Sequence, residues 1–107
     1  MRTLAALALL AATAPAVAGP EEAAVQIIRK GERDGFGSGT VVRTGRAGSF
    51  VLTNWHVAPD RGCTLTVLHD GRAYPAEWLG ADDRTDLALL RVNALLPAVE
   101  LADQLPP

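Results

Sequence analysis

The chain has 107 residues, of which 49% are hydrophobic, 21% charged and 5% aromatic, and its formal net charge is −2. This composition is typical of an ordinary globular protein and allows at most one small domain. The ten Lys and Arg residues are scattered among twelve Asp and Glu residues, so no basic patch is available to follow a phosphate backbone. Nucleic acid is therefore not an expected partner.

The amino terminus has the pattern of an export signal. Arg2 supplies a positive charge, Leu4–Ala12 is a short apolar run, and Ala16-Val17-Ala18 is a small-x-small cleavage site. A buried helix is the weaker interpretation, because Gly19-Pro20 and two acids follow directly. We expect residues 1–18 to be a signal peptide and residues 19–107 to be periplasmic or secreted, with no membrane segment after cleavage.

The remainder of the chain consists of short β-strand patterns separated by turn residues. Asp70-Gly71 is a strong hairpin signal, residues 44–48 form a glycine-containing hairpin loop and residues 80–84 form a polar loop. No helix is expected after the signal peptide. The expected strands are 24–29, 36–43, 50–52, 64–68, 72–79 and 86–92, with 99–101 as a further candidate. This spacing predicts an antiparallel all-β unit, either a small barrel or a sandwich.

One histidine and one aspartate stand out as candidate catalytic residues. His56 follows an apolar strand that ends in Thr53-Asn54, and Asp86 stands at the start of the most apolar strand. A carboxylate that binds one ring nitrogen of a histidine fixes its tautomer and stabilises the imidazolium formed during proton transfer. Two strands and their turns separate the two residues, which is enough chain to bring them together at one end of a barrel. We expect Asp82 and Asp83 to be solvated loop acids.

Four motifs along the chain carry a family resemblance. They are Gly-Ser-Gly-Thr-Val-Val at 37–42, Val-Leu-Thr-Asn-Trp-His-Val at 51–57, Asp-Gly-Arg at 70–72 and Asp-Leu-Ala-Leu-Leu at 86–90. In this order and spacing they resemble the amino-terminal half of a trypsin-like serine protease, and they are most similar to the bacterial HtrA (Deg) type. The resemblance extends from about Ala24 to Leu105.

The resemblance implies a fold and an activity. Such proteases contain two six-stranded β-barrels, so residues 19–107 are expected to be the first barrel, with His56 as general base and Asp86 as the acid that orients it. The nucleophilic serine of the family lies in the second barrel, in a Gly-x-Ser-Gly-Gly motif that also forms the oxyanion hole. Ser38 and Ser49 are the only serines here, and neither is followed by Gly-Gly. The chain is therefore expected to be truncated before the second barrel.

Two functional hypotheses follow. The first is an exported serine endopeptidase with polypeptide substrates, of which this chain holds the His/Asp half and is inactive alone. The alternative is a non-catalytic secreted β-barrel, either a pseudoprotease or a binding module. No cofactor is expected, and no ligand spacing around His56 and His69 supports a metal site. No motif defines cleavage specificity or oligomeric state. Cys63 has no partner within the chain for a disulfide.

Overall fold

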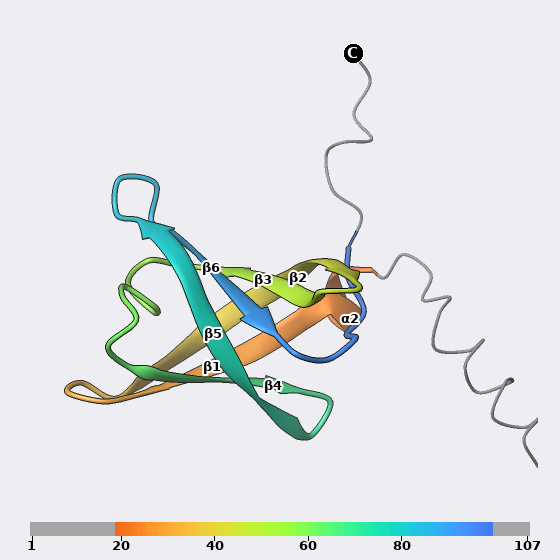
Figure 1. Ribbon diagram of the computed structural model, residues 1–107, viewed down its shortest axis with the longest axis horizontal. Coiled ribbons are helices and arrows are strands. Elements are labelled where there is room, and N and C mark those ends of the chain that lie inside the picture. Colours follow the sequence, from red (N-terminus) through yellow and green to blue (C-terminus); the bar gives the residue numbers. More distant parts are fainter. Residues whose placement is uncertain (1–18, 100–107) are drawn as a thin grey trace, which may run out of the picture.

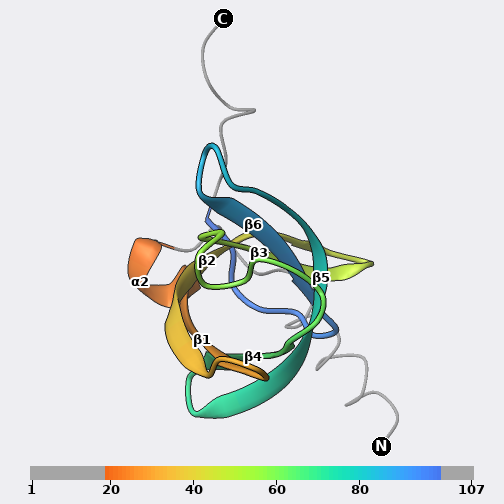
Figure 2. The ribbon, with the colours of Figure 1, turned by 90° about the vertical axis from the view of Figure 1, so that its left-hand side faces the viewer.

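Residues 19–99 are described by a computed structural model of the chain. The strands are β1 (Ala24–Lys30), β2 (Gly35–Gly45), β3 (Gly48–Thr53), β4 (Thr64–His69), β5 (Arg72–Asp82) and β6 (Leu87–Val92). They close into a barrel in the order β1-β2-β3-β6-β5-β4, and every neighbouring pair is antiparallel. The view along the barrel in Figure 2 shows this ring. The predicted all-β, antiparallel, six-stranded barrel is confirmed.

Several local expectations were wrong. A one-turn helix, α2 (Pro20–Ala23), precedes β1, and the Glu22 carboxylate accepts the Gly19 N–H at 2.8 Å. Proline at the first helical position and this bond to the residue before the helix favour the turn. Residues 80–82, expected in a loop, belong to β5 because they pair with β6. The predicted signal peptide lies outside the described residues, as do residues 100 and 101 of the candidate last strand, and Val99 is not in a strand.

The barrel interior is filled by alternate residues of the strands. Side chains of successive strand residues point to opposite faces, so every second residue of a strand points into the core. Ile27, Val41, Val51 and Leu90 are fully buried, and Ser49 is the buried polar residue among them. The remaining buried strand residues are Val25, Gly48, Thr53, Leu65, Val67, Ala88 and Val92.

The two longest strands close the barrel by changing partner along their length. The first half of β5 pairs with β4 and its second half with β6, and β2 is shared in the same way between β1 and β3. The register shifts between Val41 and Arg43 in β2 and between Trp78 and Gly80 in β5. Such bulges increase local twist, which lets a strand turn a corner of a barrel.

Because neighbouring strands are antiparallel, the connecting segments divide between the two ends of the barrel. The β1–β2, β3–β4 and β5–β6 connections lie at one end, and the β2–β3 and β4–β5 hairpins lie at the other (Figure 1). His56 belongs to the β3–β4 connection and Asp86 to the β5–β6 connection. The topology therefore brings both residues to the same end.

Gly37 in β2 leaves room for the segment that follows His56. A Cβ atom at position 37 would lie 2.5 Å from Cγ2 of Val57, which is itself buried. A Cβ atom at Gly45, in the same strand, would meet nothing within 4 Å. The absence of a side chain at 37 therefore allows the His56 turn to pack closely against β2.

We predict that Gly37→Ala lowers the free energy of unfolding by about 1–3 kcal/mol, because the added methyl group overpacks against Val57. Gly45→Ala is the matched control and should change it by less than about 0.5 kcal/mol. Urea denaturation followed by tryptophan fluorescence measures both. Equal effects of the two substitutions would contradict this packing.

Candidate active site

The turn after β3 projects His56 out of the end of the barrel. The Asn54 carbonyl accepts hydrogen bonds from the N–H groups of Val57 at 3.0 Å and Ala58 at 3.1 Å. Val57 and Ala58 are buried, whereas Trp55 and His56 are exposed. The Trp78 indole, from β5, donates to the Ala58 carbonyl at 3.0 Å. One tight turn is thus anchored by two apolar residues and presents the imidazole at the surface.

Asp86 is held in an uncommon backbone conformation directly before β6. Its φ of 59° lies in the left-handed region, which Asp and Asn tolerate better than most residues. The side-chain amide of Asn54 donates to the Asp86 carbonyl at 3.0 Å. Asp86 was expected to begin the strand, but it is the last turn residue before β6. This conformation aims its carboxylate at the β3–β4 turn instead of along the sheet.

The structure brings the two candidate residues into direct contact. Nδ1 of His56 lies 2.9 Å from Oδ2 and 3.0 Å from Oδ1 of Asp86. The backbone N–H of His56 donates to the same Oδ1 at 3.1 Å. The carboxylate therefore binds both the main chain and the ring of one residue, which defines the ring orientation. An Nδ1–H donor leaves Nε2 as the proton-accepting nitrogen.

The electrostatics of the pair favour an ionised carboxylate. The backbone N–H of His56 is the main cause that lowers the pKa of Asp86, and the ring of His56 adds to it against the opposing effect of burial. The side chains are 65% exposed for His56 and 44% exposed for Asp86. Close to half of the Asp86 side chain is therefore accessible to water in this chain.

An open hollow lies next to the imidazole. It has a volume of about 590 Å³ and is lined by Arg29, Trp55, His56, Asp60 and Cys63, among others. Its walls combine an indole, charged groups and backbone from the β1–β2 and β3–β4 connections. The imidazole is therefore accessible from this side.

In the described part of the chain, the other acids, histidine and serines singled out in the sequence form no hydrogen bond with the His56–Asp86 pair. Asp82 accepts the Arg84 N–H at 3.0 Å, and Asp83 is an exposed turn residue. His69 ends β4 and its Nε2 lies 2.8 Å from the Glu22 carbonyl, which ties α2 to the barrel. The Ser38 carbonyl accepts the Thr53 hydroxyl at 2.7 Å. Among residues 19–99, no group of three His, Cys, Asp or Glu side chains is placed to hold a metal ion.

Two contributors to the site were not predicted from the sequence. Asn54 was interpreted as a residue that ends a strand, yet its side chain fixes the Asp86 backbone. Arg29 was expected to lie in an ordinary strand, yet it donates to the carbonyls of His56 and Val57. For Asn54 a signal exists, since a polar amide two residues before a candidate His is suited to bridging two segments by hydrogen bonds. For Arg29 no local signal exists, because its partners are backbone atoms far along the chain.

Comparisons with known proteins show which family the chain belongs to. The trypsin-like peptidase domain family matches residues 37–107, and the chain belongs to this family. A probable periplasmic DegP-like serine endoprotease of Marinomonas sp. (strain MWYL1) is 40% identical over 76 residues, which are 70% of this chain and 16% of the relative. The periplasmic pH-dependent serine endoprotease DegQ of Escherichia coli (strain K12) is 35% identical over 72 residues, 65% of this chain and 15% of DegQ.

A solved structure shares the fold. The crystal structure of the serine endoprotease from Yersinia pestis superposes with a TM-score of 0.65 at 30% sequence identity, covering 82% of this chain and 32% of that one. The chain thus spans about a third of that protein and about a sixth of the two relatives. The resemblance to HtrA (Deg) proteases inferred from the motifs is confirmed for the part of those proteins that this chain represents.

We predict that Asp86 makes the chain sensitive to acid. Because the pKa of Asp86 is lowered in the folded state, its contribution to stability is present above the ordinary aspartate value and is lost as the pH falls through the lowered folded value. Asp86→Asn should therefore lose less stability than the wild type between neutral pH and about pH 2.5. Urea denaturation at the two pH values tests this, with Asp83→Asn as control. An acid sensitivity unchanged in Asp86→Asn would refute the prediction.

Backbone strain at position 86 yields a second prediction. At neutral pH, Asp86→Ala should be less stable than Asp86→Asn by about 1–2 kcal/mol, because Ala tolerates the left-handed conformation poorly and Asn tolerates it well. Denaturation midpoints of the two variants, together with Asp86→Gly, provide the comparison. If Asp86→Ala is as stable as Asp86→Gly and Asp86→Asn, residue 86 does not adopt the left-handed conformation in solution.

Proposed function

We propose that this chain is the His/Asp-bearing first barrel of an exported serine endopeptidase. The observation that carries the proposal is the 2.9 Å contact between Nδ1 of His56 and Oδ2 of Asp86 in a member of the trypsin-like peptidase family. In this proposal, residues 1–18 are a cleaved signal peptide and residues 19–107 form the barrel. The relatives named as periplasmic support a periplasmic location.

In the proposed mechanism, His56 first accepts a proton and later donates it. Asp86 accepts the Nδ1–H and keeps Nε2 free to take the hydroxyl proton of a serine as its oxygen attacks the peptide carbonyl. The carboxylate stabilises the imidazolium that results. His56 then gives this proton from Nε2 to the leaving amine, so that the peptide bond breaks and an acyl-serine remains. Water, activated by the same ring, releases the acyl group.

The serine must come from outside this chain in the proposed enzyme. Ser49 is fully buried, donates its hydroxyl to the Ala94 carbonyl at 2.6 Å and accepts the Leu96 N–H at 2.8 Å. Ser38 lies in β2, and neither serine has the Gly-Gly that follows the nucleophile of the family. We therefore assign the nucleophile and the oxyanion hole to a second barrel, and polypeptides to the role of substrate.

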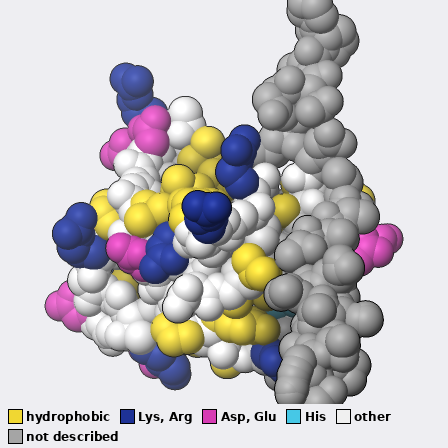
Figure 3. All heavy atoms as spheres, turned by 45° about the vertical axis from the view of Figure 1, so that its right-hand side comes forward, with side chains coloured by type: hydrophobic (Ala, Val, Ile, Leu, Met, Phe, Trp, Pro, Cys, Tyr) yellow, Lys and Arg dark blue, Asp and Glu magenta, His cyan; other side chains and the backbone are white. Residues whose placement is uncertain are grey.

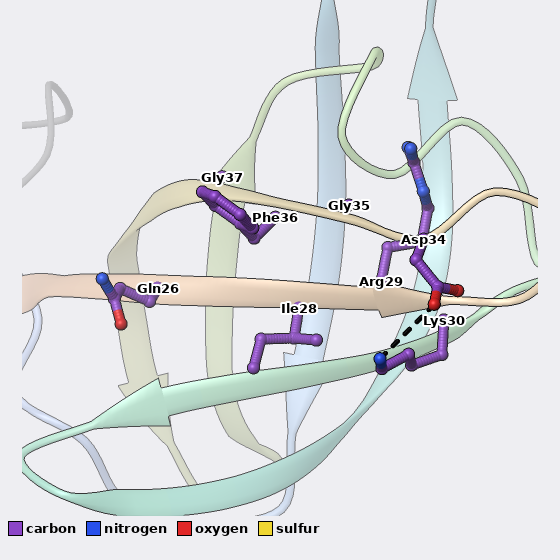
Figure 4. A pocket seen from close by; sticks show the side chains of 8 residues that line it. All are labelled: Gln26, Ile28, Arg29, Lys30, Asp34, Gly35, Phe36 and Gly37. Atoms are coloured by element: carbon purple, nitrogen blue, oxygen red, sulfur yellow. Dashed lines mark hydrogen bonds and ion pairs between the residues drawn. The ribbon is translucent and has the colours of Figure 1, made fainter.

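Exposed apolar side chains support the proposal that a second barrel packs against this one. Phe36 is 84% exposed, Leu95 59% and Leu87 41%. Figure 4 shows Phe36 of β2 and Ile28 of β1 beside an open groove, which has a volume of about 490 Å³. On the face drawn in Figure 3, groups of hydrophobic side chains lie between charged ones. Phe36 and Leu87 lie at the same end of the barrel as His56 and Asp86, and exposed apolar surface is typical of an interface.

The proposal makes a prediction for the chain and for the gene. The purified chain should hydrolyse no casein and react with no fluorophosphonate, because removing a triad nucleophile and its oxyanion donors costs several orders of magnitude in rate.

The coding DNA beyond codon 107 should encode Gly-x-Ser-Gly-Gly. In the protein that this longer reading frame encodes, Asp86→Asn should lower kcat about 10⁴-fold, whereas Asp83→Asn should leave it unchanged.

Two outcomes would contradict this proposal. Peptidase activity of the 107-residue chain that disappears in His56→Ala would show that the nucleophile is already present. A stop codon directly after codon 107 would favour the non-catalytic secreted barrel instead.

A further inference from the structure

Arg29 links β1 to the turn that carries His56. Its Nη1 donates to the carbonyl oxygens of His56 and Val57, both at 2.9 Å, and its Nε donates to the Arg33 carbonyl at 2.9 Å. In Figure 4 the side chain leaves β1 toward the β3–β4 connection. One guanidinium group thus joins the β1–β2 connection to the candidate active-site turn.

The surroundings of Arg29 are arranged for this contact. Gly35, its partner in the β1–β2 register, leaves space for the guanidinium, since a Cβ atom there would lie 2.8 Å from Nη2. Among the described residues, no carboxylate forms an ion pair with Arg29, so its donors serve main-chain carbonyls. Hydrogen bonds from a charged donor are roughly twice as strong as neutral ones.

The other hydrogen bonds that hold the turn leave two of its carbonyl oxygens to Arg29. The Asn54 carbonyl closes the turn on itself, Trp78 holds Ala58, and Asp86 holds the N–H of His56. None of these bonds uses the carbonyl oxygens of His56 and Val57, which accept hydrogen bonds from Arg29. The His56–Val57 and Val57–Ala58 peptide groups are therefore each held from two sides, with the N–H bound to the Asn54 carbonyl and the C=O bound to Arg29.

We propose that Arg29 is a positioning residue, which keeps the His56 turn in the orientation that lets Asp86 bind the ring; this inference rests on the proposed function of His56. Arg29 touches neither the imidazole nor a reacting atom in this arrangement. A lysine cannot replace it fully, because a single ammonium group on a flexible stem does not reproduce the planar, divergent donors that bind carbonyls of two connections at once.

The test compares Arg29→Gln and Arg29→Lys in the full chain by NMR. Arg91→Gln is the matched control, because Nη1 of Arg91 also donates to a main-chain carbonyl, that of Ala47, at 2.7 Å. Ala47 lies in the β2–β3 hairpin, at the opposite end of β3 from His56. Each variant is characterised by the titration of the Asp86 carboxyl carbon and by amide hydrogen exchange at Val57 and Ala58.

We expect Arg29→Gln to raise the pKa of Asp86 toward its ordinary value, because the His56 N–H that chiefly lowers it is no longer held in place. Exchange at Val57 and Ala58 should become about tenfold faster. Arg29→Lys should give smaller changes of the same sign, and Arg91→Gln should give neither. A general loss of stability would instead accelerate exchange at Ile27 and Val51 in the core equally.

The inference is overturned if folded Arg29→Gln keeps both wild-type values, or if Arg91→Gln changes them as much. If Arg29→Gln does not fold, Arg29→Lys decides by the same two readouts. Wild-type values in the Arg29 variants, with the His56–Asp86 contact intact, refute the positioning role and leave the proposed function standing. Absence of that contact in the wild-type chain refutes both.

Discussion

The carboxylate of Asp86 binds His56 twice, through the backbone N–H at 3.1 Å and through Nδ1 at 2.9 Å. Much of the local structure serves this contact. The left-handed conformation at position 86 turns the carboxylate toward the β3–β4 connection, and the Asn54 amide holds the Asp86 backbone by donating to its carbonyl. On the other side, buried Val57 and Ala58 fix the turn from which the ring projects. A flexible surface pair would lack this definition, because exposed ion pairs are weak by themselves.

The barrel topology makes the contact available to residues far apart in sequence. Antiparallel pairing of β3 with β6 places the end of one strand beside the beginning of the other, since Thr53 is opposite Ala88. His56 and Asp86 extend from these two strands at the same end of the barrel. The lack of a side chain at Gly37 also matters, because any side chain there would occupy the space of Val57.

Sequence patterns predicted much of this arrangement and missed what depends on distant atoms. Alternating apolar residues such as Val25 and Ile27, and the Asp70-Gly71 turn, are local signals, so the strands were found to within a few residues. Residues 80–82 look polar in isolation, and only pairing with β6 makes them a strand. The Thr-Asn-x-His-Val and Asp-Leu-Ala motifs indicated His56 and Asp86. The role of Arg29 could not be predicted, because its acceptors are carbonyl oxygens, which every residue has.

A long-range ¹⁵N–¹H NMR spectrum of the His56 ring, recorded for the wild-type chain and for Asp86→Asn at neutral pH, tests the contact between His56 and Asp86 most directly. The neutral wild-type ring should carry its hydrogen on Nδ1, bonded to Asp86, and Asp86→Asn should shift the tautomer population toward Nε2–H. A wild-type ring with hydrogen on Nε2 and an unbonded Nδ1, unchanged by Asp86→Asn, would contradict it.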